Sequence, residues 1–501
     1  MANTSAAADH TYGNFVEPRT PGIGRLGRGE SVLIIIALAI FGLVMMSNLW
    51  GGVIYFLVVA PLMWQSLKKD KFGVSAFEKR AERFMFNHAK KNQRTQYRSG
   101  PVGVIPSGTY RLPGLLAAST AYKCRDGLGR SFALIHVPHT DHYSVAFLTE
   151  AEGMTLTDQA QIERWVAEWG AFMRECGYES DIAGGSVIVE VAPDFGGRLK
   201  QHIEPQLSKH ASEVGRTMML QAIDPDVSRS SMVRTWVTLT FTGSAGFGSP
   251  PRSVEDVAVS VASRLPDIGS RIELAGGTDA VPVSVTSLSR MIRTSYDPGI
   301  AEDIERVMSD PGERVNFDWD NAGPVAHDAG WESMRHDSGV SASYTMGIAP
   351  RGEVRSRILA DLLKPQAEMT RKRVALLFRP IPVSEAGDVA ERDVKHLGAR
   401  AGSTKQELSS SAQAVVAASQ TAREEATGAG LVNFGLAVTA TVTDPDQLPV
   451  AKLAVTGRGR ASKIELRPAY GSQDVVFAAT LPVGLILTDH VRVPNQLKEH
   501  L

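Results

Sequence analysis

Residues 31–67, SVLIIIALAIFGLVMMSNLWGGVIYFLVVAPLMWQSL, contain no Asp, Glu, Lys, Arg or His. As one α-helix this run would measure about 55 Å, whereas the hydrocarbon core of a bilayer is about 30 Å thick. Polar and glycine residues at 47–52 interrupt the run, and Trp50 there suits a headgroup boundary. The run therefore predicts a transmembrane helical hairpin with short limbs at 32–46 and 53–64. A buried hairpin of a soluble protein is the alternative.

Basic residues flank the uncharged run on both sides, and none lies in its turn. They are Arg19, Arg25, Arg28, Lys68, Lys69, Lys71, Lys79, Arg80 and Arg83. Because Lys and Arg are retained on the cytoplasmic side, this pattern predicts a two-span, multi-pass protein of the cell membrane with both termini in the cytoplasm. Residues 1–29 then form a cytoplasmic tail, 30–67 the hairpin and 68–109 a basic juxtamembrane linker. A helix within 72–98 either lies on anionic headgroups or is solvated.

The composition bounds the classes of function. The chain has 501 residues, of which 43% are hydrophobic and 21% charged, and this length accommodates two or three domains. A formal net charge of −1 gives no basic excess, so we expect no direct nucleic-acid binding. Cys124 and Cys176 are the two cysteines, and they stand in no disulfide framework or thiolate metal motif, in agreement with a reducing cytoplasm.

From residue 110 onward the pattern mixes helices and strands. Residues 235–242 alternate apolar and threonine side chains, as in a half-buried strand, while apolar residues within 162–173 recur at helical spacing. The expected fold class is a membrane-anchored α+β protein whose cytoplasmic lobes are ferredoxin-like in part. We place the first lobe at 110–330 and the second at 331–501. A polar helical excursion, expected to hold two helices, occupies 384–427 within the second lobe.

Motifs that carry chemistry are scarce. No GxxxxGK[ST] phosphate-binding loop occurs, so we expect neither nucleotide hydrolysis nor a cofactor, and we assign no catalytic residue. His136, His139 and His142, with Asp141, could supply imidazole and carboxylate ligands to zinc. Solvated or locally hydrogen-bonded histidines are the other reading of this cluster. Carboxylate pairs such as Glu424 with Glu425 are read as solvated faces.

Several short segments resemble one family of membrane proteins found in actinobacterial conjugative-element and type IV secretion-like gene clusters. They are residues 11–15 (TYGNF), 111–120 (RLPGLLAAST), 421–425 (TAREE), 442–446 (VTDPD), 467–473 (RPAYGSQ) and 478–484 (AATLPVG). The resemblance covers nearly the whole chain. Its architecture is similar to a small two-span secretion subunit joined to the amino-terminal, non-motor domain of the CagE/TrbE/VirB conjugation ATPases.

This resemblance implies a non-catalytic inner-membrane scaffold of a conjugative secretion apparatus for DNA or protein transfer. Its partners would be a separate P-loop ATPase, other membrane subunits and the lipid bilayer, and a homo-oligomer is left open. Glu424, Glu425, Tyr470 and Gln473 are the expected docking residues. A type VII secretion membrane component is one alternative function. A membrane-anchored metal-dependent enzyme that uses His136, His139 and His142 is another.

Overall fold

The computed structural model describes residues 12–13, 15, 28–101, 103, 109–151, 157–194, 206–208, 210, 212–222, 231–244, 250–309, 317–350, 352–403 and 408–490. The chain divides into two compact units. We call residues 1–13, 95–386 and 428–490 the sheet unit, and residues 14–94, 387–427 and 491–501 the helical unit. Each is described by itself.

The sheet unit is built on one sheet of thirteen described strands, and the pairs along it are antiparallel. Its path runs through β1 (Gln96–Arg98), β8 (Ala326–Ala329), β9 (Met334–His336), β10 (Gly339–Ile348), β12 (Leu431–Val442), β11 (Arg371–Ile381), β5 (Ile182–Pro193), β6 (Ser231–Thr242), β4 (His142–Ala151), β3 (Ser131–Val137) and β2 (Thr120–Arg125). Off this path, β13 (Glu465–Pro468) pairs with β10, and β7 (Gly277–Pro282) pairs with β4.

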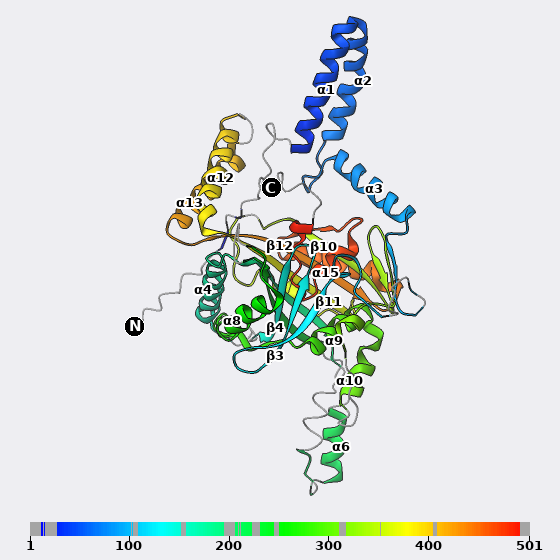
Figure 1. Cartoon of the computed structure of the whole chain (residues 1–501), viewed down its shortest axis with the longest axis vertical. Coiled ribbons are helices and arrows are strands. Elements are labelled where there is room, and N and C mark those ends of the chain that lie inside the picture. The colour runs from blue at the N-terminus through cyan, green and yellow to red at the C-terminus, as the bar shows by residue number, and fades with distance from the viewer. Residues whose placement is uncertain are drawn as a thin grey trace. The chain divides into compact units, whose positions relative to one another are not determined.

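Helices cover both faces of this sheet, because α8 and α9 pack against different sets of sheet residues; Figure 1 labels both helices. The helices of the unit are α4 (Gln159–Cys176), α6 (Glu213–Ala222), α8 (Val254–Leu274), α9 (Val285–Tyr296), α10 (Ala301–Ser309), α11 (Ala360–Leu363), α14 (Leu448–Ala461) and α15 (Gln473–Ala479). Short 3-10 turns lie at η1 (Gly114–Leu116), η3 (Pro298–Ile300), η4 (Trp319–Asn321), η5 (Pro445–Gln447) and η6 (Leu487–His490).

Alternation along the strands sorts the core into two faces. On the α8 face, Phe132 and Phe147 of the sheet pack with Val261 of α8, and farther along the sheet Val438 packs with Val455 of α14. On the α9 face, a second cluster joins α9 and α15 to small and aromatic sheet residues. Strand β11 shows the division, because Val374 and Phe378 belong to the α8 face while Ala375 belongs to the α9 face.

The expected fold class, membrane-anchored with partly ferredoxin-like lobes, is wrong, because the structure has one large antiparallel sheet instead. Strands from both expected lobes share it, because β5 pairs with β11 from Lys372↔Val191 to Phe378↔Gly185. This pairing joins segments almost two hundred residues apart. Strand patterns reveal which residues face a core, but a pairing between distant strands leaves no local signal.

The prediction of a two-span transmembrane hairpin, with its multi-pass membrane location, is also wrong. Within the described part of the chain, no helix combines the length and the apolar character needed to cross a membrane. The uncharged run forms α1 (Arg28–Ser47) and α2 (Leu49–Leu67), and the break falls at Asn48. Polar and glycine residues at the helix ends leave apolar limbs of only about 22 Å and 18 Å, against a bilayer core of about 30 Å.

In the helical unit, α1 and α2 lie side by side as a hairpin (Figure 1). Asn48 caps α2 by accepting a hydrogen bond from the backbone N–H of Trp50 at 3.1 Å. The basic linker contains α3 (Ala76–Lys91), which starts with a capping box between Ser75 and Glu78. The expected excursion forms two helices, α12 (Val383–Ser403) and α13 (Leu408–Ala426).

Gly185 provides a test of the close approach between the paired strands. A Cβ at this position would lie 2.5 Å from the Phe378 ring and 2.5 Å from the backbone carbonyl oxygen of Thr238. We therefore expect Gly185→Ala to lower the free energy of unfolding by about 1–3 kcal/mol, measured by chemical denaturation. Gly435→Ala is the matched control, because a Cβ on that strand glycine meets nothing within 4 Å. Equal denaturation midpoints for the two variants would contradict the pairing described here.

Candidate functional site

The excursion interrupts a regular antiparallel pair. Strands β11 and β12 stay in register from Arg371↔Thr441 to Ile381↔Leu431, so their ends meet as in a hairpin. A turn of two to five residues would join such ends, yet here the whole of α12 and α13 intervenes. The sheet therefore does not need this segment for its connection. Long insertions in short connections commonly serve function.

Helix α13 exposes both charge and one large apolar side chain. Glu424 is exposed and accepts a hydrogen bond from Gln420 Nε2 at 2.9 Å, while Val416 is 65% exposed. Glu425 is half-buried. A Cβ added to Gly387 would lie 3.8 Å from Glu425 Oε2, which is an ordinary van der Waals distance. Helix α13 thus presents an exposed carboxylate and an exposed valine, the kinds of group that form the polar rim and the apolar anchor of an interface.

The second pair of expected docking residues lies in the sheet unit. Tyr470 is half-buried, its ring stacks on Trp331 with centroids 5.4 Å apart, and the Arg467 guanidinium lies 5.7 Å from its centroid. Gln473 is fully buried instead. Its side chain accepts from the Ser343 N–H at 2.7 Å and donates to the Ser343 carbonyl oxygen at 3.2 Å. We therefore omit Gln473 from the docking surface.

The three histidines of the suggested metal cluster point to different partners. His136 stacks on Tyr143, with ring centroids 4.3 Å apart, and its Nε2 lies 3.4 Å from Asp141. His142 is buried with its Nε2 3.7 Å from Asp489, and burial lowers its pKa despite that carboxylate. His139 stacks on His490.

Among the described residues, no group of three or more His, Cys, Asp or Glu is arranged to hold a metal ion. The histidine cluster therefore lends no support to the metal-dependent enzyme.

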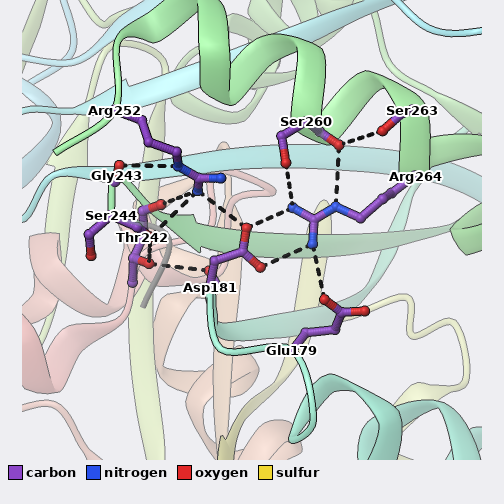
Figure 2. A network of polar contacts seen from close by, with 9 residues as sticks. All are labelled: Glu179, Asp181, Thr242, Gly243, Ser244, Arg252, Ser260, Ser263 and Arg264. Atoms are coloured by element: carbon purple, nitrogen blue, oxygen red, sulfur yellow. Dashed lines mark hydrogen bonds and ion pairs between the residues drawn. The ribbon is translucent and has the colours of Figure 1, made fainter. Parts of the chain in front are cut away.

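An ion-pair network holds α8 to the sheet (Figure 2). Asp181 Oδ2 lies 2.8 Å from Arg264 Nη2 and 3.2 Å from Arg252 Nη2, and its other oxygen accepts from Arg264 Nη1 at 3.0 Å. The Arg264 guanidinium also lies 4.8 Å from the Phe241 ring centroid. Because both arginines are engaged by the chain's own carboxylates and carbonyls, we assign this network a structural role.

The network makes stability depend on pH. Burial raises the pKa of Asp181, but hydrogen bonds and charge from Arg264 and Arg252 outweigh it, so the pKa is lowered. A carboxylate whose pKa is lower in the folded state contributes its full stabilisation at pH values above its unfolded-state pKa of about 3.9. This stabilisation is lost as the pH falls through the folded-state pKa. We expect Asp181→Asn to destabilise most at neutral pH, with the difference from wild type shrinking below about pH 4. Denaturation at a series of pH values measures it.

Asp361→Asn is the matched control for this pH series. Asp361 pairs with Lys364 at 2.9 Å, but the two side chains are 45% and 65% exposed, so solvent screens the pair. Its substitution should change the denaturation midpoint little at any pH. If the stability of wild type and of Asp181→Asn depended on pH in the same way, Asp181 would not be the source of the acid sensitivity.

A buried charged cluster on the α9 face was missed by the sequence analysis. Arg371 is 6% exposed, Arg373 1% and Glu190 1%. Arg371 Nη1 donates to Glu190 Oε1 at 2.9 Å, and Arg373 is the direct cross-strand neighbour of Glu190. The sequence signal was present, since Arg371 and Arg373 precede a fully apolar run. Strand β11 begins at Arg371, ahead of that run, and this brings both arginines into the sheet.

Hydroxyl groups extend this cluster across neighbouring strands. The register places Ser343, Thr439 and Arg373 in one row with Glu190, and the Ser343 and Thr439 hydroxyls lie 3.1 Å apart. Arg373 Nε donates to Thr480 Oγ1 at 3.3 Å. The cluster thus forms a polar band inside an otherwise apolar layer, which is costly unless each charge is compensated.

A scan against protein-family models finds no match, and no curated protein matches the chain.

Proposed function

We propose that this protein is a non-catalytic scaffold of a type IV-like, conjugative secretion apparatus and that it docks a separate P-loop ATPase. The observation that carries the proposal is the α12–α13 excursion, which replaces a short hairpin turn between β11 and β12. Its charged and apolar groups, Glu424 and Val416, are exposed. Since the sheet does not need this segment to connect β11 with β12, we infer that the segment serves to bind a partner.

The nature of the partner follows from what the chain lacks and what it resembles. The sequence has no phosphate-binding loop with its lysine, so ATP-driven work in such an apparatus would fall to another subunit. Residues 111–120, 467–473 and 478–484 resemble conjugative proteins, and the architecture in part resembles the non-motor domain of conjugation ATPases, which supports a motor as that subunit. Tyr470 lies in the segment after which, by this resemblance, the conjugation ATPases continue into their motor domain.

Co-isolation from native cells tests this proposal. The affinity-tagged full chain is recovered after mild crosslinking, and proteins enriched over an untagged control are identified by mass spectrometry. We expect a P-loop ATPase of the conjugative class among the enriched proteins, in a stoichiometric amount. Recovery of the full chain without any P-loop ATPase would count against the docking role.

A further inference from the structure

The buried cluster on the α9 face carries more positive than negative charge. Arg371 and Glu190 bind each other directly at 2.9 Å and together form a neutral pair. Arg373 is then the surplus charge, although Glu190 still acts on it electrostatically. Burial lowers the pKa of Arg373 only to about 10, so its guanidinium remains charged at neutral pH. An uncompensated buried charge of this kind costs several kcal/mol.

Nearby groups do not supply the missing negative charge. His336 is buried, and its Nδ1 and Nε2 lie within hydrogen-bond distance of the Tyr296 carbonyl oxygen and the Ser341 hydroxyl. Burial lowers the pKa of His336 to about 3, so this ring is neutral. Tyr296 is also buried, and burial raises its pKa, which keeps the phenol neutral.

The guanidinium of Arg373 has an open hydrogen-bonding edge. Its Nε donates to Thr480, and the Phe477 ring covers one of its faces with the centroid 4.4 Å away. Nη1 and Nη2 are both buried and have no hydrogen-bond partner, and the same holds for Nε of Arg371. Donors therefore outnumber the one carboxylate oxygen, Glu190 Oε2, that is left without a partner in this cluster.

We propose that the Nη1–Nη2 edge of Arg373 binds a small inorganic anion of about the size of chloride. An anion satisfies the donors and offsets the surplus charge together, whereas a water molecule satisfies donors and leaves the charge. We expect a small ion because the site is shielded from solvent: Arg373 is 1% exposed, and Phe477 and Thr480 are fully buried. This inference does not rest on the docking proposal.

Chloride binding to the wild-type full chain is the direct test. In equilibrium dialysis against radiolabelled chloride, with sodium gluconate holding the ionic strength constant, we expect saturable binding of about one chloride per chain. We also expect the thermal unfolding midpoint to rise by about 2–4 °C when chloride replaces gluconate, as for a ligand that binds only the folded state. Absence of saturable binding would overturn the proposal, including the outcome in which water alone fills the edge.

Two arginine variants locate the site. Arg373→Met should abolish both the saturable binding and the chloride-dependent shift. Arg379→Met is the matched control, because Arg379 lies on the same strand with its side chain 53% exposed, and it should keep both. Chloride binding that survives in folded Arg373→Met would overturn the assignment. If Arg373→Met does not fold, the wild-type dialysis decides alone.

Discussion

Glu190→Gln is expected to lower the free energy of unfolding of the sheet unit by about 3–5 kcal/mol, because it leaves buried positive charge without its carboxylate. Glu190 interacts with two arginines: its Oε1 lies 2.9 Å from Arg371 Nη1, and Arg373 is its direct partner in the strand register. Arg371→Met should cost less, since Glu190 then still faces Arg373. Chemical denaturation of both variants, followed by a signal from the sheet, measures this order.

The exposed pair on α10 provides the control for this experiment. Glu302 lies 3.3 Å from Arg306, with side chains 61% and 69% exposed, so Glu302→Gln should change stability by less than about 1 kcal/mol. The double variant Glu190→Gln with Arg371→Met completes a double-mutant cycle, and its cost should differ from the sum of the single costs. Additive costs, or a larger loss in Arg371→Met than in Glu190→Gln, would show that Glu190 does not act on both arginines.

Excising residues 387–427 from the full chain should abolish capture of the ATPase while the sheet unit keeps its stability. Ala386 and Gly428 are the natural points to join with a short Gly-Ser linker, because they bound the excursion in the division into units. The sheet should tolerate this loss, since β11 and β12 pair up to Ile381↔Leu431 without the excursion. Capture is measured by co-isolation, and stability by chemical denaturation.

Charge reversal on α13 tests whether capture depends on its acidic side chains or only on the presence of the two helices. Glu424→Lys combined with Glu425→Lys should weaken capture severalfold, because charge complementarity at an interface sets much of its specificity. Glu302→Lys combined with Asp303→Lys is the matched control on α10, where both side chains are exposed, and it should leave capture unchanged. Capture that survives the excision would place the docking surface elsewhere on the chain.

Several elements could be predicted from the sequence because their signal is local. Apolar and threonine side chains alternate in residues 235–242, and this segment is part of β6. Helical periodicity in residues 162–173 predicted α4, and the alanine-rich excursion forms the two helices expected of it. In each case the spacing of side chains along a few turns or one strand is enough to define the element.

Other features depended on contacts between distant residues. Gln473 was expected on a docking surface, but α15 packs against β10 and buries it. The histidines of 136–142 are close in sequence, yet their rings meet different groups: Tyr143, Asp489 and His490. A residue's neighbours in the chain do not determine which groups it meets across a sheet.

Local sequence patterns were enough to predict the secondary structure of the stronger segments and a break in the uncharged run near Asn48, and the sequence shows that no phosphate-binding loop is present. The folded chain was needed to learn that one sheet unites both halves of the chain and that Glu190, Arg371 and Arg373 meet inside it. The physical reason is that a local pattern sets the backbone conformation and the face of each side chain, whereas burial and charge pairing arise from long-range strand register.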